Sequence, residues 1–151
     1  MRKKNYRREG FSLIELLVST AVFTIITLAA FPAYDYFSKL NTLNEGVSII
    51  VSAISRTELI SRASLQNTGW GISLQSSSIV IFNGASLASS TPSLLEVFPL
   101  PSGITISGPT IFVFSKFYGL PTATGTIRVS VAGGKPYNIT INSQGSETYQ
   151  Y

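Results

Sequence analysis

Residues Gly10 to Val18 read G-F-S-L-I-E-L-L-V, and an almost uninterrupted apolar run continues from this stretch to Phe31. The segment from Phe11 to Phe31 has about 21 residues, close to the roughly 20 that an α-helix needs to cross a bilayer core. Its single charged side chain is Glu15. Because a carboxylate inside a membrane-length helix is unfavourable, its presence calls for a specific role. The stretch therefore predicts a membrane helix that carries a functional group.

The positive charge of the chain lies in front of this helix. The formal net charge is +4, and the first nine residues, with five basic side chains and one acidic one, carry all of it. The rest of the chain has six basic and six acidic residues. Because Lys and Arg hold the adjacent end of a membrane segment in the cytoplasm, we interpret residues 1–10 as a leader that sets topology. The same charge is weak evidence for a nucleic-acid partner.

The composition argues against several kinds of functional site. Cysteine and histidine are both absent, which rules out disulfides, thiol nucleophiles, imidazole bases and zinc sites built from these residues. Asp35 is the only aspartate, so an acidic cluster for calcium is not expected. The chain has no G-x-S-x-G elbow and no glycine-rich phosphate loop. The sequence thus predicts a protein that is not an enzyme and that holds no metal and no cofactor.

Beyond the apolar run, the pattern predicts that the helix continues. Pro32 lacks an amide N–H, so we expect a kink there. Apolar residues then recur every three or four positions, which is helical periodicity with one face to bury. The expected stripe is Phe37, Leu40, Leu43 (or Asn44), Val47, Ile50 and Ile54. We predict one helix from Ser12 to about Arg62, with its first half in lipid and its second half packed on the domain that follows.

After Asn67 the periodicity changes from helical to alternating, which predicts short strands. The expected strands are residues 70–74, 78–82, 94–98, 104–106, 110–114, 126–131 and 137–142. The last two should form a hairpin through Gly133-Gly134, each with one buried and one exposed face. The chain is thus predicted to be an α+β protein in four parts. These are a basic leader (1–10), an apolar transmembrane helix (11–32), an amphipathic helix (33–63) and an antiparallel β-domain (64–151).

The basic leader, the Gly10-Phe11 pair, Glu15 and the apolar run together resemble the class III signal of type IV pilins and type II secretion pseudopilins. The resemblance implies that a prepilin peptidase cuts after Gly10 and methylates the new N-terminal Phe11. A glycine lets a protease approach the backbone closely. The resemblance also implies that Glu15 pairs with the N-terminal ammonium of a neighbouring subunit, and that residues 11–32 form the filament core. A structural role is compatible with this pairing, because Ser12-Leu-Ile-Glu15 matches a capping box.

Three later stretches resemble the FimT/GspH-type minor pilins and pseudopilins. They are Arg56–Arg62 followed by Gly69–Leu74, then F-V-F-x-x-x-x-G at Phe112–Gly119, then I-T-I-N-S-Q-G at Ile139–Gly145. This subgroup implies a pilin-like fold, in which a long N-terminal helix packs on two small antiparallel sheets. Major pseudopilins typically hold calcium in a C-terminal loop, so the lack of an acidic cluster favours a minor subunit.

The resulting hypothesis is a minor pilin or pseudopilin that assembles into a type IV pilus or a type II secretion pseudopilus. Expected partners are the prepilin peptidase, other pilins or pseudopilins, an inner-membrane platform protein, indirectly an assembly ATPase, and membrane lipid. We expect a single-pass protein of the inner (cytoplasmic) membrane, with its C-terminal domain outside the cytoplasm, that later enters the filament.

Two alternatives of other classes remain open. One is a DNA-capturing minor pilin of a competence filament, for which Lys116, Arg128 and Lys135 offer at most a small basic face. The other is a secreted β-rich protein whose first 30 or so residues are a cleaved signal. A mature N-terminus near Phe31 would establish the secreted protein, and one at Phe11 would exclude it.

Overall fold

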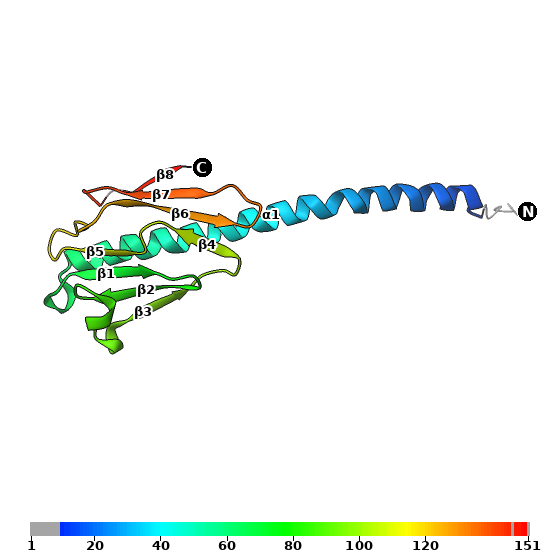
Figure 1. Ribbon diagram of the computed structural model, residues 1–151. Helices are drawn as coiled ribbons and strands as arrows, with labels where there is room; N and C mark the ends of the chain where they lie inside the picture. The colour runs from blue at the N-terminus through cyan, green and yellow to red at the C-terminus, as the bar shows by residue number, and fades with distance from the viewer. Residues whose placement is uncertain (1–9, 146, 151) are drawn as a thin grey trace, which may run out of the picture. The chain divides into compact units, whose positions relative to one another are not determined.

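The computed structural model describes residues 10–145 and 147–150 (Figure 1). The chain divides into two compact units, Met1–Phe37 and Ser38–Tyr151. The helix α1, Leu13–Arg62, supplies the described secondary structure of the first unit and the opening segment of the second. The predicted helix is therefore confirmed, with its start one residue later than expected. Pro32 lies inside α1 without ending it, and the bend at this residue stays a prediction.

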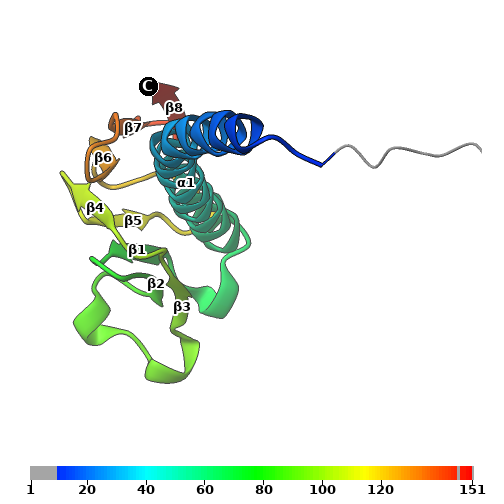
Figure 2. The same cartoon turned by 90° about the vertical axis from the view of Figure 1, so that its right-hand side faces the viewer.

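The second unit contains two four-stranded antiparallel sheets, whose strands are labelled in Figure 2. The first sheet has the order β3-β2-β1-β5 and the second the order β4-β6-β7-β8. The strands are β1 Trp70–Leu74, β2 Ser78–Asn83, β3 Glu96–Pro99, β4 Ile104–Ser107, β5 Ile111–Phe114, β6 Gly125–Val131, β7 Tyr137–Ile141 and β8 Glu147–Gln150. The expected α+β architecture, one long helix and two small antiparallel sheets, is confirmed.

One hydrophobic core joins the second unit's part of α1 to both sheets. Ile50 and Ile54 of α1 meet Ile72 and Phe112 of the first sheet and Ile139 of the second, and all five side chains are fully buried. The single tryptophan, Trp70, also lies in this core, where its indole N–H donates to the carbonyl of Leu65 at 3.0 Å. The alternating segments thus bury their apolar residues against the helix, as the sequence predicted.

The predicted helical stripe is buried only in part. Its last four members are buried, whereas Phe37 is 62% exposed and Leu40 is 38% exposed. The expectation that these two residues pack on the domain was wrong, because the packed core begins at Leu43. Helix propensity alone would make Gly46 a weak point in α1. The structure gives this glycine a role in packing. A β-carbon at Gly46 would lie 2.0 Å from Cδ1 of Ile104, so the glycine makes room for this side chain of β4 against α1.

The turn of residues 99–103 connects two sheets. It is flanked by β3 and β4 as expected, but β3 pairs with β2 whereas β4 pairs with β6. The amide of Leu100 donates to the carbonyl of Ser77 at 3.0 Å, so the neighbouring Pro99 directs its nitrogen to the outer edge. A proline at that position removes no bond from the ladder.

The two sheets differ in how they use their faces. In β6 and β7 buried and less buried residues alternate, as predicted for this hairpin, and the outward Thr126 and Thr140 hydroxyls lie 2.9 Å apart. In β1 every residue is buried, and four residues of β2 are buried in succession. Gly71 makes this possible in part, because a β-carbon there would lie 2.3 Å from the ring of Phe82. The central pair of the first sheet therefore has no solvent face.

Candidate processing and assembly site

The described chain begins with an accessible, non-helical segment. Gly10 has no atom within 4 Å of the position that a β-carbon would take, and Phe11 is 82% exposed. Ser12 also precedes the helix. A protease must bind an extended backbone on both sides of the bond that it cuts, and the bond between Gly10 and Phe11 lies outside α1. The geometry is therefore compatible with cleavage at the predicted bond.

Ser12 and Glu15 occupy the backbone positions of a capping box without its side-chain bonds. The carbonyl of Ser12 accepts from the amide of Leu16 at 3.1 Å, which makes Ser12 the N-cap and places Glu15 three residues later. Within residues 10–145, no hydrogen bond joins the two side chains to the helix start. Glu15 is exposed in the first turn, where the helix dipole favours a negative charge. Its carboxylate is therefore accessible to a second molecule.

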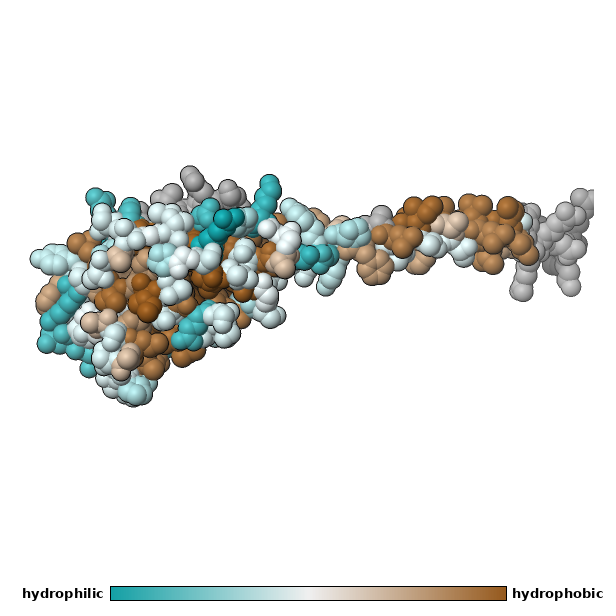
Figure 3. Space-filling model, viewed as in Figure 1, coloured by the Kyte–Doolittle hydropathy of each residue, from teal (hydrophilic) through white to brown (hydrophobic). Residues whose placement is uncertain are grey.

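The helix surface around Glu15 is apolar and uncovered. α1 is the one helix in the described chain that is long and apolar enough to cross a membrane, and none of its apolar window is buried by the rest of the protein. Figure 3 shows this surface in brown. The large side chains that are more than half exposed are Phe11, Leu13, Ile14, Leu16, Leu17, Val18, Phe23, Ile25, Ile26, Leu28 and Phe31. Such a surface requires lipid or apolar helices around it.

The threonines of this segment make their polar bonds within the helix. The hydroxyls of Thr20, Thr24 and Thr27 donate to carbonyls three or four residues earlier, at distances from 2.7 to 3.0 Å. Side chains bonded in this way tolerate an environment without water. Glu15 is then the charged exception on a helix that suits lipid.

The comparison with known families points to the same residues. The prokaryotic N-terminal methylation motif matches residues 5–31, which include Gly10, Phe11 and Glu15. The chain carries a type IV pilin-like signal. Residues 5–9 of the match lie outside the described part. No curated protein and no solved structure matches the chain.

The pilin-like signal indicates a class of protein and a coarse function. The signal is typical of type IV pilin-like proteins that a prepilin peptidase processes, and it implies assembly with other pilins. It is typical of a structural subunit and fits a single-pass anchor in the inner membrane. Among the described side chains, no group of three or more His, Cys, Asp or Glu could hold a metal ion.

The three stretches that resemble the FimT/GspH subgroup meet at the end of α1. Gly119 and Gly145 are both buried and both have positive φ, at 64° and 78°. A β-carbon at Gly119 would lie 2.6 Å from Cγ of Arg62, and one at Gly145 would lie 3.2 Å from Oε1 of Glu58. Glu58 and Arg62 form an ion pair. Sequence reasoning noted each stretch separately and missed this junction, although a glycine four or five residues after a strand was the available signal.

A second ion pair joins α1 to the outer strand of the first sheet. Arg56 donates to both carboxylate oxygens of Glu96, at 2.6 and 2.8 Å. This hydrogen bonding, more than the neighbouring charge, raises the pKa of Arg56. Hydrogen bonding from Arg56 likewise lowers the pKa of Glu96, and partial burial opposes that shift. The pair connects β3 to the helix.

The three candidate basic residues do not form one face. Lys116 bonds to Asn67, just beyond the C-terminal end of α1. Lys135 lies in the turn between β6 and β7, and Gly133 of the same turn is near Lys39. Lys39 belongs to the first turn of the part of α1 that lies in the second unit. Lys39 and Arg62 are about 35 Å apart along an ideal helix axis. Lys116 and Lys135 therefore lie toward opposite ends of this helix segment and do not share one face.

Proposed function

We propose that this protein is a minor pilin or pseudopilin subunit, cleaved after Gly10, N-methylated at Phe11 and assembled into a type IV pilus or a type II secretion pseudopilus. The observation that carries the proposal is the methylation motif at residues 5–31, which continues directly into an apolar and uncovered helix. The FimT/GspH-type resemblance of the β-domain supports a minor subunit.

The mechanism follows from the exposed first turn. Cleavage creates an ammonium group at Phe11, and the Glu15 carboxylate of a neighbouring subunit pairs with it. Removing a carboxylate from water is unfavourable, and a paired positive charge offsets this penalty. An incoming subunit is therefore held at one axial position, while its apolar helix exchanges lipid for the helices of the filament. A subunit that retains Glu15 accepts contacts within the fibre.

The topology follows from the charge of the leader. The basic residues 1–10 stay in the cytoplasm, and the β-domain lies outside it. Before assembly the chain is a single-pass inner-membrane protein in contact with lipid. A platform protein in that membrane, coupled to a cytoplasmic ATPase, extracts the processed subunit into the pilus or pseudopilus.

The first test is of processing, in a host with a prepilin peptidase. Gly10→Leu should leave an uncut precursor in the membrane, because a large side chain blocks the approach to the backbone. Ser12→Ala is the matched control, since it changes a neighbouring residue and should be cut normally. Intact-mass measurement of the wild-type chain should give a methylated N-terminal Phe11. Normal cleavage of Gly10→Leu, or a mature terminus near Phe31, would contradict the proposal.

The second test is of assembly. Glu15→Gln keeps a side chain that suits a helix N-terminus but removes its charge, so the processed variant should stay in the membrane instead of entering filaments. Its normal incorporation would refute the charge pairing. In wild-type cells, abundant mature chain in the sheared fraction identifies a surface pilus. Mature chain confined to membranes identifies a short pseudopilus.

A further inference from the structure

A rigid turn after β5 exposes two aromatic side chains. This segment, residues 115–120, is called the aromatic turn below. Phe117 is 64% exposed and Tyr118 is 73% exposed. Bonds inside the turn run from the amide of Ser115 to the carbonyl of Leu120 at 2.8 Å, and from the amide of Gly119 to the carbonyl of Ser115 at 2.9 Å. The aromatic side chains are thus presented on an ordered backbone.

The backbone of the turn is strained at the aromatic position. Phe117 has a φ of 68°, in the left-handed region that bulky residues rarely adopt. Its amide donates to the carbonyl of Ser61 at 3.2 Å, which attaches the turn to the end of α1. A glycine or asparagine would fit this conformation with less strain. Because the phenyl ring is exposed, packing inside the protein does not explain why phenylalanine stands there.

The aromatic turn also carries a positive charge. Nζ of Lys116 lies 4.4 Å from the centre of the Phe117 ring and bonds to the side-chain oxygen of Asn67. In the described part of the chain, Lys116 has no carboxylate partner. A partner surface should therefore offer an apolar depression with an acidic residue beside it.

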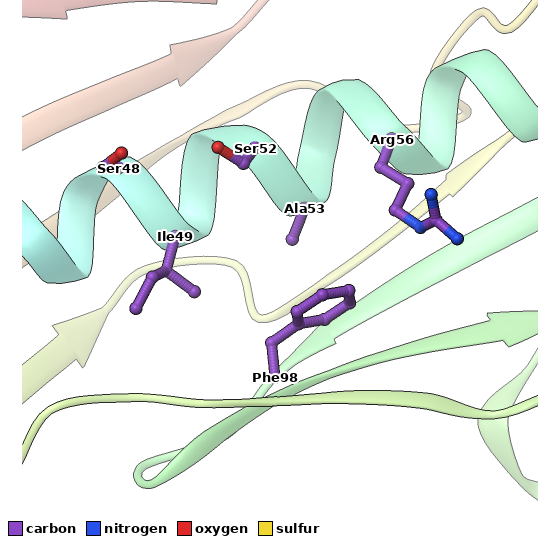
Figure 4. Close-up of a pocket in the computed structure, with 6 residues that line it drawn as sticks. All are labelled: Ser48, Ile49, Ser52, Ala53, Arg56 and Phe98. Atoms are coloured by element: carbon purple, nitrogen blue, oxygen red, sulfur yellow. The ribbon is translucent and has the colours of Figure 1, made fainter.

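The same chain has such a depression. The groove between α1 and β3 is lined by Ser48, Ile49, Ser52, Ala53, Arg56 and Phe98 (Figure 4). Figure 4 shows Ile49 and Ala53 projecting from the helix toward the ring of Phe98. Glu45 lies three residues before Ser48, is exposed, and has no ion pair within residues 10–145. An apolar groove and a carboxylate thus lie within one helical turn of each other.

A chain cannot fill its own groove with its own aromatic turn. The turn is bonded to Ser61, whereas Ala53 of the groove lies eight residues earlier, about 12 Å along the helix axis. We propose that the aromatic turn of one copy binds in this groove of a second copy, with Lys116 beside Glu45. This contact joins different surfaces of the two copies, so it does not close into a two-fold dimer and leaves one of the two surfaces on each copy open to other pilins. It rests on the proposed function, which brings copies together in one orientation.

Cysteine cross-linking tests the contact directly, because the chain has no cysteine of its own. Two differently tagged full-length copies are expressed together, one with Leu120→Cys in the aromatic turn and one with Ser52→Cys in the groove. Both changes leave Phe117 and Tyr118 in place. Oxidation in membranes should give a mixed dimer that carries both tags, since a disulfide needs α-carbons within about 7 Å. Thr105→Cys on β4 replaces the groove cysteine in the matched control and should give little product.

The outcomes separate the docking from the proposed function. Equal yields from the groove and control pairs, predominant dimers between two Leu120→Cys copies, or no mixed dimer would each overturn the docking. The mature N-terminus is measured in the same samples. Correct processing without the mixed dimer refutes the docking alone, whereas a specific mixed dimer of chains that are not cut at Gly10 refutes the proposed function alone.

Charge reversal provides a second readout in the cross-linking pair. Lys116→Glu or Glu45→Lys alone should lower the mixed-dimer yield about fivefold, because a favourable pair becomes a repulsive one. Combining both changes in every copy should restore the yield. Loss in both single variants without recovery in the double variant would contradict the pairing of these two charges.

Discussion

Gly46→Ala tests how closely β4 packs against α1. Two opposing effects meet at this position. Alanine is about 1 kcal/mol more favourable than glycine inside a helix. Its β-carbon, however, would lie 2.0 Å from Cδ1 and 3.4 Å from Cγ1 of Ile104, a side chain that is 7% exposed. Overpacking of a buried site costs about 1–3 kcal/mol, so we expect Gly46→Ala to lower the free energy of unfolding by about 1 kcal/mol.

A double variant isolates the crowding from the propensity gain. Ile104→Val removes Cδ1, the atom in closest contact, and should alone destabilise the protein by about 1 kcal/mol. When Gly46→Ala is already present, the smaller valine leaves room for the added methyl group, so Ile104→Val should then cost nothing or restore stability. The two changes should therefore be non-additive by about 1–2 kcal/mol. Asn41→Ala, on an exposed position of α1, is the control for helix propensity alone.

Urea unfolding of the full-length chain in detergent micelles measures these differences. Trp70 is the only tryptophan and is 2% exposed, so its fluorescence reports on the opening of the core. If Gly46→Ala were more stable than the wild type by the full propensity gain, the crowding between position 46 and the Ile104 side chain would be refuted. Strict additivity of the two substitutions would refute it equally, because it would show that the two residues do not touch.

Three further predictions concern the second unit and use the same unfolding assay. Gly119→Ala should lower the free energy of unfolding by about 1–3 kcal/mol, because the residue has a positive φ and its β-carbon would crowd the Arg62 side chain. Gly84→Ala, with φ of 93° and open space around it, should lower it only by the cost of the positive φ. Equal losses in the two variants would exclude a role for the contact between Gly119 and the end of α1. Ser61→Ala should lower the free energy of unfolding by about 1–3 kcal/mol, since the buried serine oxygen accepts a hydrogen bond from the first amide of β1 at 3.0 Å and its removal leaves that N–H unsatisfied. A smaller loss would mean that water replaces the hydroxyl. Glu96 has a lowered pKa, so its pair with Arg56 contributes stability above the carboxyl's ordinary value of 4.5 and loses it as the pH falls through the lower folded value. Because both groups are more than a third exposed, the effect should stay below about 1 kcal/mol, and Glu96→Gln should flatten the acid limb of the stability curve; an unchanged acid limb would contradict this.

The helix and most strands could be predicted because their signals are local. Periodicity of three to four residues gave α1, and alternation gave the β6–β7 hairpin. The assignment of β3 and β4 to different sheets has no local signal, since a turn such as residues 99–103 reads like a hairpin connection. The same limit explains Phe37 and Leu40, which continue a helical stripe but lie outside the core. Periodicity shows which face is apolar and does not show how far the partner extends.

Some residues of the candidate sites could likewise be predicted from local sequence, and others could not. Gly10, Phe11 and Glu15 lie within six consecutive residues, so their spacing identifies the signal without a structure. Gly119 and Gly145 act together only because two turns from different sheets reach the end of α1. Contacts between segments so distant in the chain follow from tertiary packing, which the sequence pattern of each segment does not contain.

The threonine hydroxyls of the apolar helix have a consequence for how a subunit changes surroundings. Because the hydroxyls of Thr20, Thr24 and Thr27 already donate to carbonyls of their own helix, they need no hydrogen-bond acceptor from the lipid or protein beside it. In the proposed assembly, transfer of this helix from the bilayer to a bundle of similar helices breaks none of these hydrogen bonds. Movement of the helix along such a bundle breaks none of them either. Glu15 carries the one charged side chain among residues 11–31. In the proposed assembly its pairing would therefore set the axial position of a helix whose surface is otherwise apolar.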